Sequence, residues 1–120
     1  MNNDLAKTWN TYTTSWKEPT EAGKRKLFEQ SLASDCKYTD PLAATKGWDE
    51  LLNYMRDFHR QIPGGYFETT YFLAHHNQSI SRWQMKNSSG EAIGEGISYG
   101  VYDPSGRLTS MTGFFETPKQ

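Results

Sequence analysis

The sequence predicts an α+β domain, with helices in the first half of the chain and strands in the second. In the first half, apolar residues recur at the three- and four-residue spacing of amphipathic helices. After Gly65 the chain is dense in aromatic and β-branched residues that alternate with polar ones, and turn sequences separate these runs. Helices followed by strands are typical of a fold whose helices lie together on one face of an antiparallel sheet.

Two helices are expected before residue 36. The first has a single apolar stripe at i, i+4, i+7 and i+11: Leu5, Trp9, Tyr12 and Trp16. Pro19 ends this pattern. The second helix is shorter, and its apolar side chains again share one side: Leu27, Phe28 and Leu32. Ser34 and Asp35 mark its expected end.

A short strand and the clearest helix follow. The strand is expected over residues 36–40, and Pro41 ends it because proline cannot donate to a sheet ladder. Residues 43–47 are expected to form a small loop. The next helix carries the longest stripe of the chain: Trp48, Leu51, Leu52, Met55, Phe58 and Ile62. Pro63, Gly64 and Gly65 stop it.

The rest of the chain predicts four strands in a meander. They are expected near residues 66–76, 79–86, 91–102 and 107–116, with turns at "NSSG" (87–90) and "DPSG" (103–106). Gly94, Gly96 and Gly100 interrupt the third of these strands, and interior glycines usually mark bends or bulges.

Length and charge exclude several classes of function. The 120 residues suit one domain, expected over residues 1–120. A net charge of −1 without a basic stripe argues against a nucleic-acid-binding protein. Cys36 is the single cysteine, so an intrachain disulfide is excluded and a reducing compartment fits. Because neither a signal peptide nor a membrane-spanning apolar run is apparent, a cytoplasmic protein without membrane contact is expected.

The order and spacing of several short motifs resemble a known superfamily. They are "YTDP" after two helices, "KGWDELLNYM", "IPGG", "HH…RW" and "GRLTSMTGFFE". Together they resemble the nuclear transport factor two-like superfamily over nearly the whole chain, and most closely its SnoaL-like branch of polyketide cyclase and ketosteroid isomerase-like proteins. Relatives include isomerases, cyclases, hydrolases and proteins without catalytic activity.

This resemblance implies a fold, a ligand and an assembly. The implied fold is a cone-shaped, curved antiparallel sheet wrapped by the three helices, also described as a cystatin-like roll. The cone would bind an apolar, oxygenated small molecule without a cofactor. Copies of the chain would form a homodimer through the open face of the sheet.

Asp40 is the first candidate catalytic residue, and it has two interpretations. An aspartate before a turn commonly accepts hydrogen bonds from nearby backbone N–H groups. The resemblance instead places Asp40 at the general-base position of the steroid isomerases, facing the pocket. Desolvation there would favour its action as a base.

Tyr12 is the residue that the resemblance aligns with a tyrosine donating to the substrate carbonyl; the alternative is a core tyrosine. The resemblance also places Ser98 where the isomerases carry a protonated aspartate. In those enzymes, a well-known case, this aspartate is the second hydrogen-bond donor of the oxyanion hole. Met55 falls where they have a supporting tyrosine. Since losing one oxyanion donor costs about 10²–10³ in rate, steroid isomerase activity itself is not expected.

His75 and His76 are expected on opposite faces of a strand, because neighbouring side chains alternate. One of them would face the pocket as a general acid, and His76 is the candidate, although parity leaves His75 open. Adjacent positions on a regular strand cannot hold one metal ion together, so no metal site is expected.

Aromatic and sulfur-containing side chains complete the expected pocket. Its ligand-binding residues are expected to be Trp16, Met55, Phe58, Trp83, Met85, Ser98 and Phe115.

Two functions follow from the sequence. The first is a cofactor-independent enzyme that abstracts a proton next to a carbonyl, for isomerisation or aldol-type cyclisation. The second is a non-catalytic binding or interaction module of the same fold.

Overall fold

The computed structural model describes residues 2–117, with side chains from Leu5 onward, and this part of the chain forms three helices and six strands. In chain order they are α1 (Asn2–Ser15), α2 (Glu21–Ser31), β1 (Leu32–Asp40), β2 (Ala43–Lys46), α3 (Trp48–Gln61), β3 (Tyr66–His75), β4 (Gln78–Lys86), β5 (Ala92–Tyr102) and β6 (Leu108–Phe114). The predicted α+β class is confirmed.

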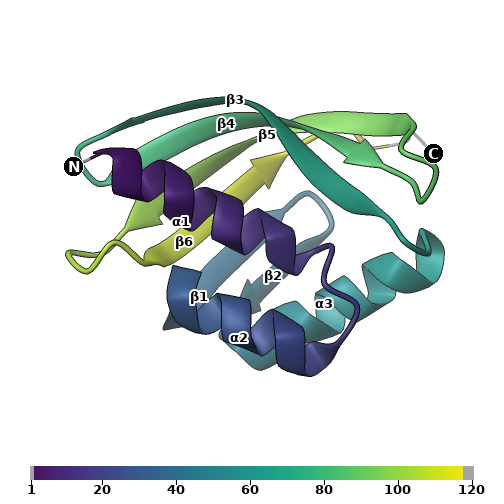
Figure 1. The fold of residues 1–120 in the computed structure, drawn as a ribbon, viewed down its shortest axis with the longest axis horizontal. Coiled ribbons are helices and arrows are strands. Elements are labelled where there is room, and N and C mark those ends of the chain that lie inside the picture. Colours follow the sequence, from purple (N-terminus) through teal and green to yellow (C-terminus); the bar gives the residue numbers. More distant parts are fainter. Residues whose placement is uncertain (1, 118–120) are drawn as a thin grey trace.

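All six strands join one curved, open sheet in the order β2-β1-β6-β5-β4-β3, and the helices lie on one of its faces (Figure 1). Strands β3 to β6 form the predicted meander. The sheet is mixed rather than antiparallel throughout, because β1 pairs with β6 in parallel. Strands β1 and β6 are far apart in the sequence, so no hairpin turn fixes the direction in which they pair. The parallel pairing could therefore not be predicted from turn sequences.

The segment around "CKYTDP" differs most from expectation. Strand β1 begins at Leu32, which also caps the end of α2, and not at Cys36. Residues 43–46 form strand β2, paired antiparallel with β1, where a loop was expected. Alanine has low β-propensity, and the pairing with β1 overrides it.

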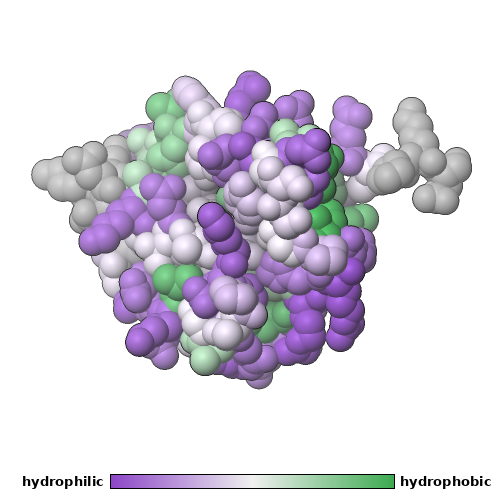
Figure 2. All heavy atoms as spheres, turned by 45° about the vertical axis from the view of Figure 1, so that its right-hand side comes forward, coloured by the Kyte–Doolittle hydropathy of each residue, from purple (hydrophilic) through white to green (hydrophobic). Residues whose placement is uncertain are grey.

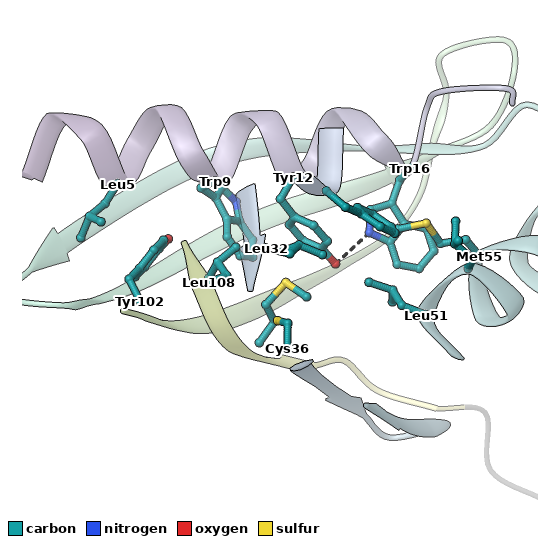
Figure 3. Close-up of a cluster of buried hydrophobic side chains, with 13 residues drawn as sticks. Leu5, Trp9, Tyr12, Trp16, Leu32, Cys36, Leu51, Met55, Tyr102 and Leu108 are labelled. Atoms are coloured by element: carbon teal, nitrogen blue, oxygen red, sulfur yellow. Dashed lines mark hydrogen bonds between the residues drawn. The ribbon is translucent and has the colours of Figure 1, made fainter. Parts of the chain in front are cut away.

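The core lies between the helices and the concave face of the sheet (Figure 3). Its buried side chains are Leu5, Trp9, Tyr12, Trp16, Phe28, Leu32, Cys36, Leu51, Leu52, Met55, Tyr102, Leu108 and Met111. Each of the four indole N–H groups has an acceptor. Trp9 donates to the Thr69 hydroxyl and Trp16 to the Tyr12 hydroxyl. Trp48 donates to the Ala33 carbonyl and Trp83 to the Ser98 hydroxyl. Large rings can therefore fill this small core without leaving their polar atoms unpaired.

Lys24 joins the first two helices. Its ammonium is buried and donates hydrogen bonds to the Ser15 carbonyl oxygen at 2.8 Å and to the Glu18 carbonyl oxygen. These bonds satisfy carbonyl groups near the end of α1, which have no partner within the helix. Burial lowers the pKa of Lys24.

The face of the sheet opposite the helices exposes large apolar side chains. We call this set the open-face patch: Tyr71, Leu73, Ile80, Ile97, Tyr99 and Phe114. They are cross-strand neighbours, since Ile80 lies opposite Leu73 and Tyr99, and Ile97 lies opposite Phe114. The side of the molecule drawn in Figure 2 is mostly hydrophilic or intermediate in hydropathy, with separate hydrophobic areas. Within residues 2–117, every helix is too short or too polar to cross a bilayer.

Candidate functional site

Asp40 lies at the end of β1, and both of its carboxylate oxygens accept hydrogen bonds. Oδ1 accepts from the backbone N–H groups of Leu42 at 2.8 Å and Ala43 at 3.0 Å. Oδ2 accepts from the hydroxyl groups of Tyr38 at 2.6 Å and Tyr54 at 2.7 Å. Asp40 is therefore a turn residue through Oδ1, as the first interpretation expected, and the centre of a side-chain cluster through Oδ2, while its role as a general base stays a prediction.

Local structure explains why these three side chains meet. Tyr38 and Asp40 are two residues apart on a strand, so they point to the same face of the sheet. Tyr54 reaches the carboxylate from α3, which packs beside β1 and β2. Hydrogen bonds to a charged acceptor are stronger than neutral ones, so the carboxylate fixes both phenols.

Burial and the neighbouring carboxylate keep these phenols protonated. Desolvation raises the pKa of Tyr38 far above its usual value, and electrostatic interactions with the Tyr12 phenol and the Asp40 carboxylate act in the same direction. The pKa of Tyr54 is also raised, by desolvation first and then by its hydrogen bond to Asp40. At neutral pH both side chains are hydrogen-bond donors.

Aromatic rings surround the cluster and fill the region where a pocket was expected. Trp16 makes edge contacts with Tyr54, Phe58 and Phe67, at centroid distances of 6.1, 5.4 and 5.1 Å. Trp83 contacts Phe67 at 5.1 Å and Phe115 at 6.1 Å. The expected pocket residues are thus brought together, but largely packed on one another.

The remaining pocket residues are also on the inner side of the sheet or in the core. Met55 is fully buried, and Met85 is half-buried on the same strand as Trp83. Ser98 lies opposite Gly113 in the sheet, and its Oγ accepts a hydrogen bond from the Trp83 indole N–H at 2.9 Å. Its own hydroxyl hydrogen is then available for another acceptor.

Gly113 leaves space beside the carboxylate. A methyl group built on it would lie 3.5 Å from Asp40 Cβ, 3.8 Å from the Tyr38 hydroxyl and 3.9 Å from Ser98 Oγ. Asp40, Tyr38 and Ser98 therefore converge beside Gly113 on the inner face of the sheet. A separate open groove of about 270 Å³ lies at the same strand ends, lined by Thr39, Asp40, Pro41, Thr112, Gly113 and Phe114. The side chains of Thr39, Thr112 and Phe114 belong to the opposite face, because they alternate with Asp40 and Gly113 along their strands.

A larger groove, of about 460 Å³, lies on the outer surface at the start of α3. We do not assign it as the site because three of its charged side chains, those of Arg25, Asp49 and Glu50, bond to one another or to the backbone. Arg25 pairs with Asp49 at 2.5 Å, and Glu50 accepts from the Lys46 backbone N–H at 2.8 Å.

Tyr12 lies deep in the core, and its hydroxyl oxygen accepts a hydrogen bond from the Trp16 indole at 2.8 Å (Figure 3). Burial raises the pKa of Tyr12, with smaller contributions from Cys36, Asp40 and Tyr54. The charge of Asp40 thus acts on Tyr12, and a direct contact with a ligand stays a prediction.

His75 and His76 are not part of this cluster. Strand β3 ends at His75, and His76 lies in the following turn with a left-handed φ of 55°. The expected alternation therefore does not apply, and both side chains are exposed beside each other at the end of the hairpin. The structure does not bring His76 to Asp40.

Sequence reasoning missed Tyr38 and Tyr54. Tyr38 could have been found by strand parity, because it is two residues before Asp40. Tyr54 lies off the apolar stripe of α3, next to Met55, which the resemblance had aligned with a supporting tyrosine. The hydroxyl of Tyr54 is the group on α3 that reaches Asp40. In residues 5–117, no three histidine, cysteine or acidic side chains gather as metal ligands would.

Comparisons with known proteins assign the chain to a family. Residues 14–115 match the family model of the SnoaL-like domain. The chain belongs to the SnoaL-like family. Among curated proteins, no significant match was found.

Solved structures agree with the SnoaL-like assignment. A SnoaL-like protein from Agrobacterium tumefaciens, provisionally described as an isomerase, has a TM-score of 0.86 at 22% identity, covering 96% of this chain and 99% of that one. A Methylobium petroleophilum protein of unknown function with a cystatin-like fold has a TM-score of 0.80 at 13% identity, with 100% and 80% covered. TerC, crystallised with polyporic acid, has a TM-score of 0.77 at 9% identity, with 94% and 92% covered. These similarities confirm the predicted cystatin-like fold.

The raised phenol pKa values predict a loss of stability in alkali. The tyrosines of an unfolded chain ionise near pH 10. Tyr12, Tyr38 and Tyr54 ionise at higher pH in the folded state, so their contribution is complete below pH 10 and is lost as the pH rises above it. We expect urea unfolding to show a fall of up to about 1.4 kcal/mol per pH unit for a fully buried phenol such as Tyr12.

The Tyr54→Phe variant should lose part of this dependence, whereas Tyr71→Phe, at a half-exposed side chain, serves as the matched control. A free energy of unfolding that stays constant from pH 9 to 11.5 would contradict the prediction.

Proposed function

We propose that this SnoaL-like protein is an enzyme that abstracts a proton next to a carbonyl group of an apolar, oxygenated small molecule. The observation that carries the proposal is the Asp40 carboxylate, which accepts hydrogen bonds from two phenols, next to aromatic rings and to the space beside Gly113. A carboxylate in such surroundings is a suitable general base. The reaction needs only side chains, and either isomerisation or aldol-type cyclisation can follow from it.

The hydrogen bonds to Oδ2 suggest how a substrate would engage. A substrate carbonyl can accept the O–H of Tyr54 or Tyr38 in place of Asp40, which frees a lone pair on Oδ2. Asp40 then takes the proton from the carbon next to the carbonyl, and the electron pair moves to form an enolate. The phenol that moved to the carbonyl oxygen stabilises the developing negative charge.

The enolate has two outcomes. In an isomerisation, Asp40 returns the proton to a different carbon of the same substrate. In an aldol-type cyclisation, the enolate carbon attacks a second carbonyl of the same molecule, and the new alkoxide takes up the proton that Asp40 removed, which regenerates the carboxylate. Tyr12 and Ser98 are the further candidate donors, Tyr12 from α1 and Ser98 from the Gly113 side.

The surroundings favour a compact, apolar ligand. On the inner face, the space beside Gly113 holds a methyl group at ordinary contact distances from Asp40, Tyr38 and Ser98, so it suits a small part of a ligand. A larger ring system would require the half-buried rings of Phe58, Phe67 or Trp83 to move. The similarity of the fold to TerC, crystallised with polyporic acid, supports small-molecule binding in a scaffold of this shape.

One observation favours the alternative of a non-catalytic binding module. The four hydrogen bonds to Asp40 occupy both of its oxygens, and proton abstraction would require one of these bonds to break first. In that alternative, Asp40 orients Tyr38 and Tyr54 as donors for a ligand that leaves unchanged.

Deuterium exchange distinguishes the two functions without knowledge of the natural substrate. The probes are simple carbon acids, 1-tetralone and cyclohex-2-enone, incubated with the protein in D₂O and followed by proton NMR. We expect the protein to accelerate exchange next to the carbonyl, and Asp40→Asn to reduce this rate by about 10²–10⁴-fold because an amide cannot take the proton.

Two variants serve as comparisons in this experiment. Asp57→Asn removes an exposed carboxylate of α3 and should leave the rate unchanged. Gly113→Ala keeps Asp40 and fills the space beside it with a methyl group at ordinary contact distances, so it should fold and lose activity. Shifts of the Trp16 and Trp83 indole signals on adding ketone, without any exchange, would contradict catalysis and support the binding module.

The proposal includes a homodimer formed through the open-face patch. This patch groups exposed apolar side chains on a face that the helices leave uncovered, with Arg82 between Tyr71 and Ile97, and such groups commonly mark interaction sites. Phe114, 59% exposed, lies at the β6 end of the patch, and Leu73, 55% exposed, lies on β3.

Sedimentation velocity tests this assembly. We expect the protein to sediment as a dimer and Phe114→Lys to shift it to a monomer, because two added charges would face each other across the interface. Leu42→Lys is the matched control, since Leu42 is 67% exposed but lies outside the patch. A monomeric wild-type protein at tens of micromolar would refute the homodimer.

A further inference from the structure

The β3–β4 hairpin brings two histidine rings together outside the Asp40 site. His75 is the last residue of β3, and His76 follows it with the left-handed φ of 55° described above. This backbone conformation breaks the strand alternation and turns both rings to the same side. Their centroids lie 5.2 Å apart, and their planes are nearly perpendicular at 88°.

The Nδ1 atoms of the two rings lie 3.0 Å apart, which is a hydrogen-bond distance. Two nitrogen atoms bound to one metal ion at about 2.0–2.1 Å and separated by this distance subtend an angle of about 91–97°. Tetrahedral coordination would separate them further, whereas adjacent positions of a square-planar or tetragonal site have about this angle. Imidazole nitrogen in that geometry suits Cu²⁺ or Ni²⁺.

We propose that His75 and His76 form a two-nitrogen chelating site for Cu²⁺ or Ni²⁺ through their Nδ1 atoms, with water at the remaining positions. Both side chains are exposed, so an ion can reach them without a change in the fold. The expectation that these histidines could not share a metal rested on a regular strand, and His76 is not in one.

Gln78 supplies the support that a metal-bound histidine usually has. The Tyr99 hydroxyl donates to the Gln78 amide oxygen, Oε1, at 2.7 Å. The Gln78 amide nitrogen lies 3.3 Å from Nε2 of His75. In this arrangement the amide donates to His75 Nε2, and His75 Nδ1–H donates to His76. When a metal displaces that proton, His75 carries its hydrogen on Nε2 instead.

The amide can follow this change by turning over. Its oxygen then accepts from His75 Nε2–H, and its NH₂ group donates to the Tyr99 oxygen. A partner on the distal nitrogen fixes the tautomer and the ring orientation of a ligating histidine. Gln78 therefore supports both the hydrogen-bonded and the metal-bound pair.

Copper binding by the full chain tests the proposal. The probe is CuCl₂ in a buffer that does not coordinate copper, measured by isothermal titration calorimetry and electron paramagnetic resonance. We expect one Cu²⁺ per chain, with nitrogen couplings from two imidazoles. His75→Gln and His76→Gln should each weaken binding by about tenfold or more, since even losing a supporting partner costs about 10–100-fold. Zn²⁺ should bind more weakly than Cu²⁺.

His59→Gln is the matched control, because His59 is the only other histidine and its ring lies beside the Gly65 carbonyl. It should bind Cu²⁺ like the wild type, and thermal unfolding should show that all three variants are folded. Equal affinity of the wild type and the double variant His75→Gln/His76→Gln, or a signal from a single imidazole, would overturn the proposal.

Discussion

The carboxylate of Asp40 is the interaction on which the arrangement of the site depends. It joins three parts of the chain by hydrogen bonds: the end of β1, the turn into β2, and α3 through Tyr54. Each hydrogen bond to a charged group contributes about 1.5–3 kcal/mol, and its loss leaves a partly buried charge without that partner. One residue therefore holds the strand end and positions the two donors of the candidate site.

Aromatic packing sets the second constraint. A chain with few aliphatic residues builds its core from large rings, and Trp16 contacts rings from β1, α3 and β3. These rings occupy much of the concave side of the sheet, so the space left there beside Gly113 suits a small group. The same rings shield the phenols of Tyr38 and Tyr54 from water, which strengthens their bonds to Asp40.

Much of the fold could be predicted from the sequence because its elements carry strong periodic signals. The third helix and the four-strand meander were expected nearly at their observed bounds. The parallel pairing of β1 with β6 and the short strand β2 were not, since both depend on contacts between distant or weakly β-forming residues. In the site, Asp40 was found through a resemblance, whereas Tyr54 was missed because only the crossing of α3 over β1 brings it there. His76 was misplaced by a single left-handed residue, which periodicity cannot show.

A double-mutant cycle on Tyr38→Phe and Tyr54→Phe, measured by urea unfolding at pH 7, tests the central role of Asp40 most directly. Both hydroxyl groups donate to the same oxygen, so we expect each single change to cost about 1.5–3 kcal/mol. The double variant should deviate from additivity by about 0.5–3 kcal/mol. Single changes that each cost less than about 0.5 kcal/mol and simply add would contradict a carboxylate that organises the site.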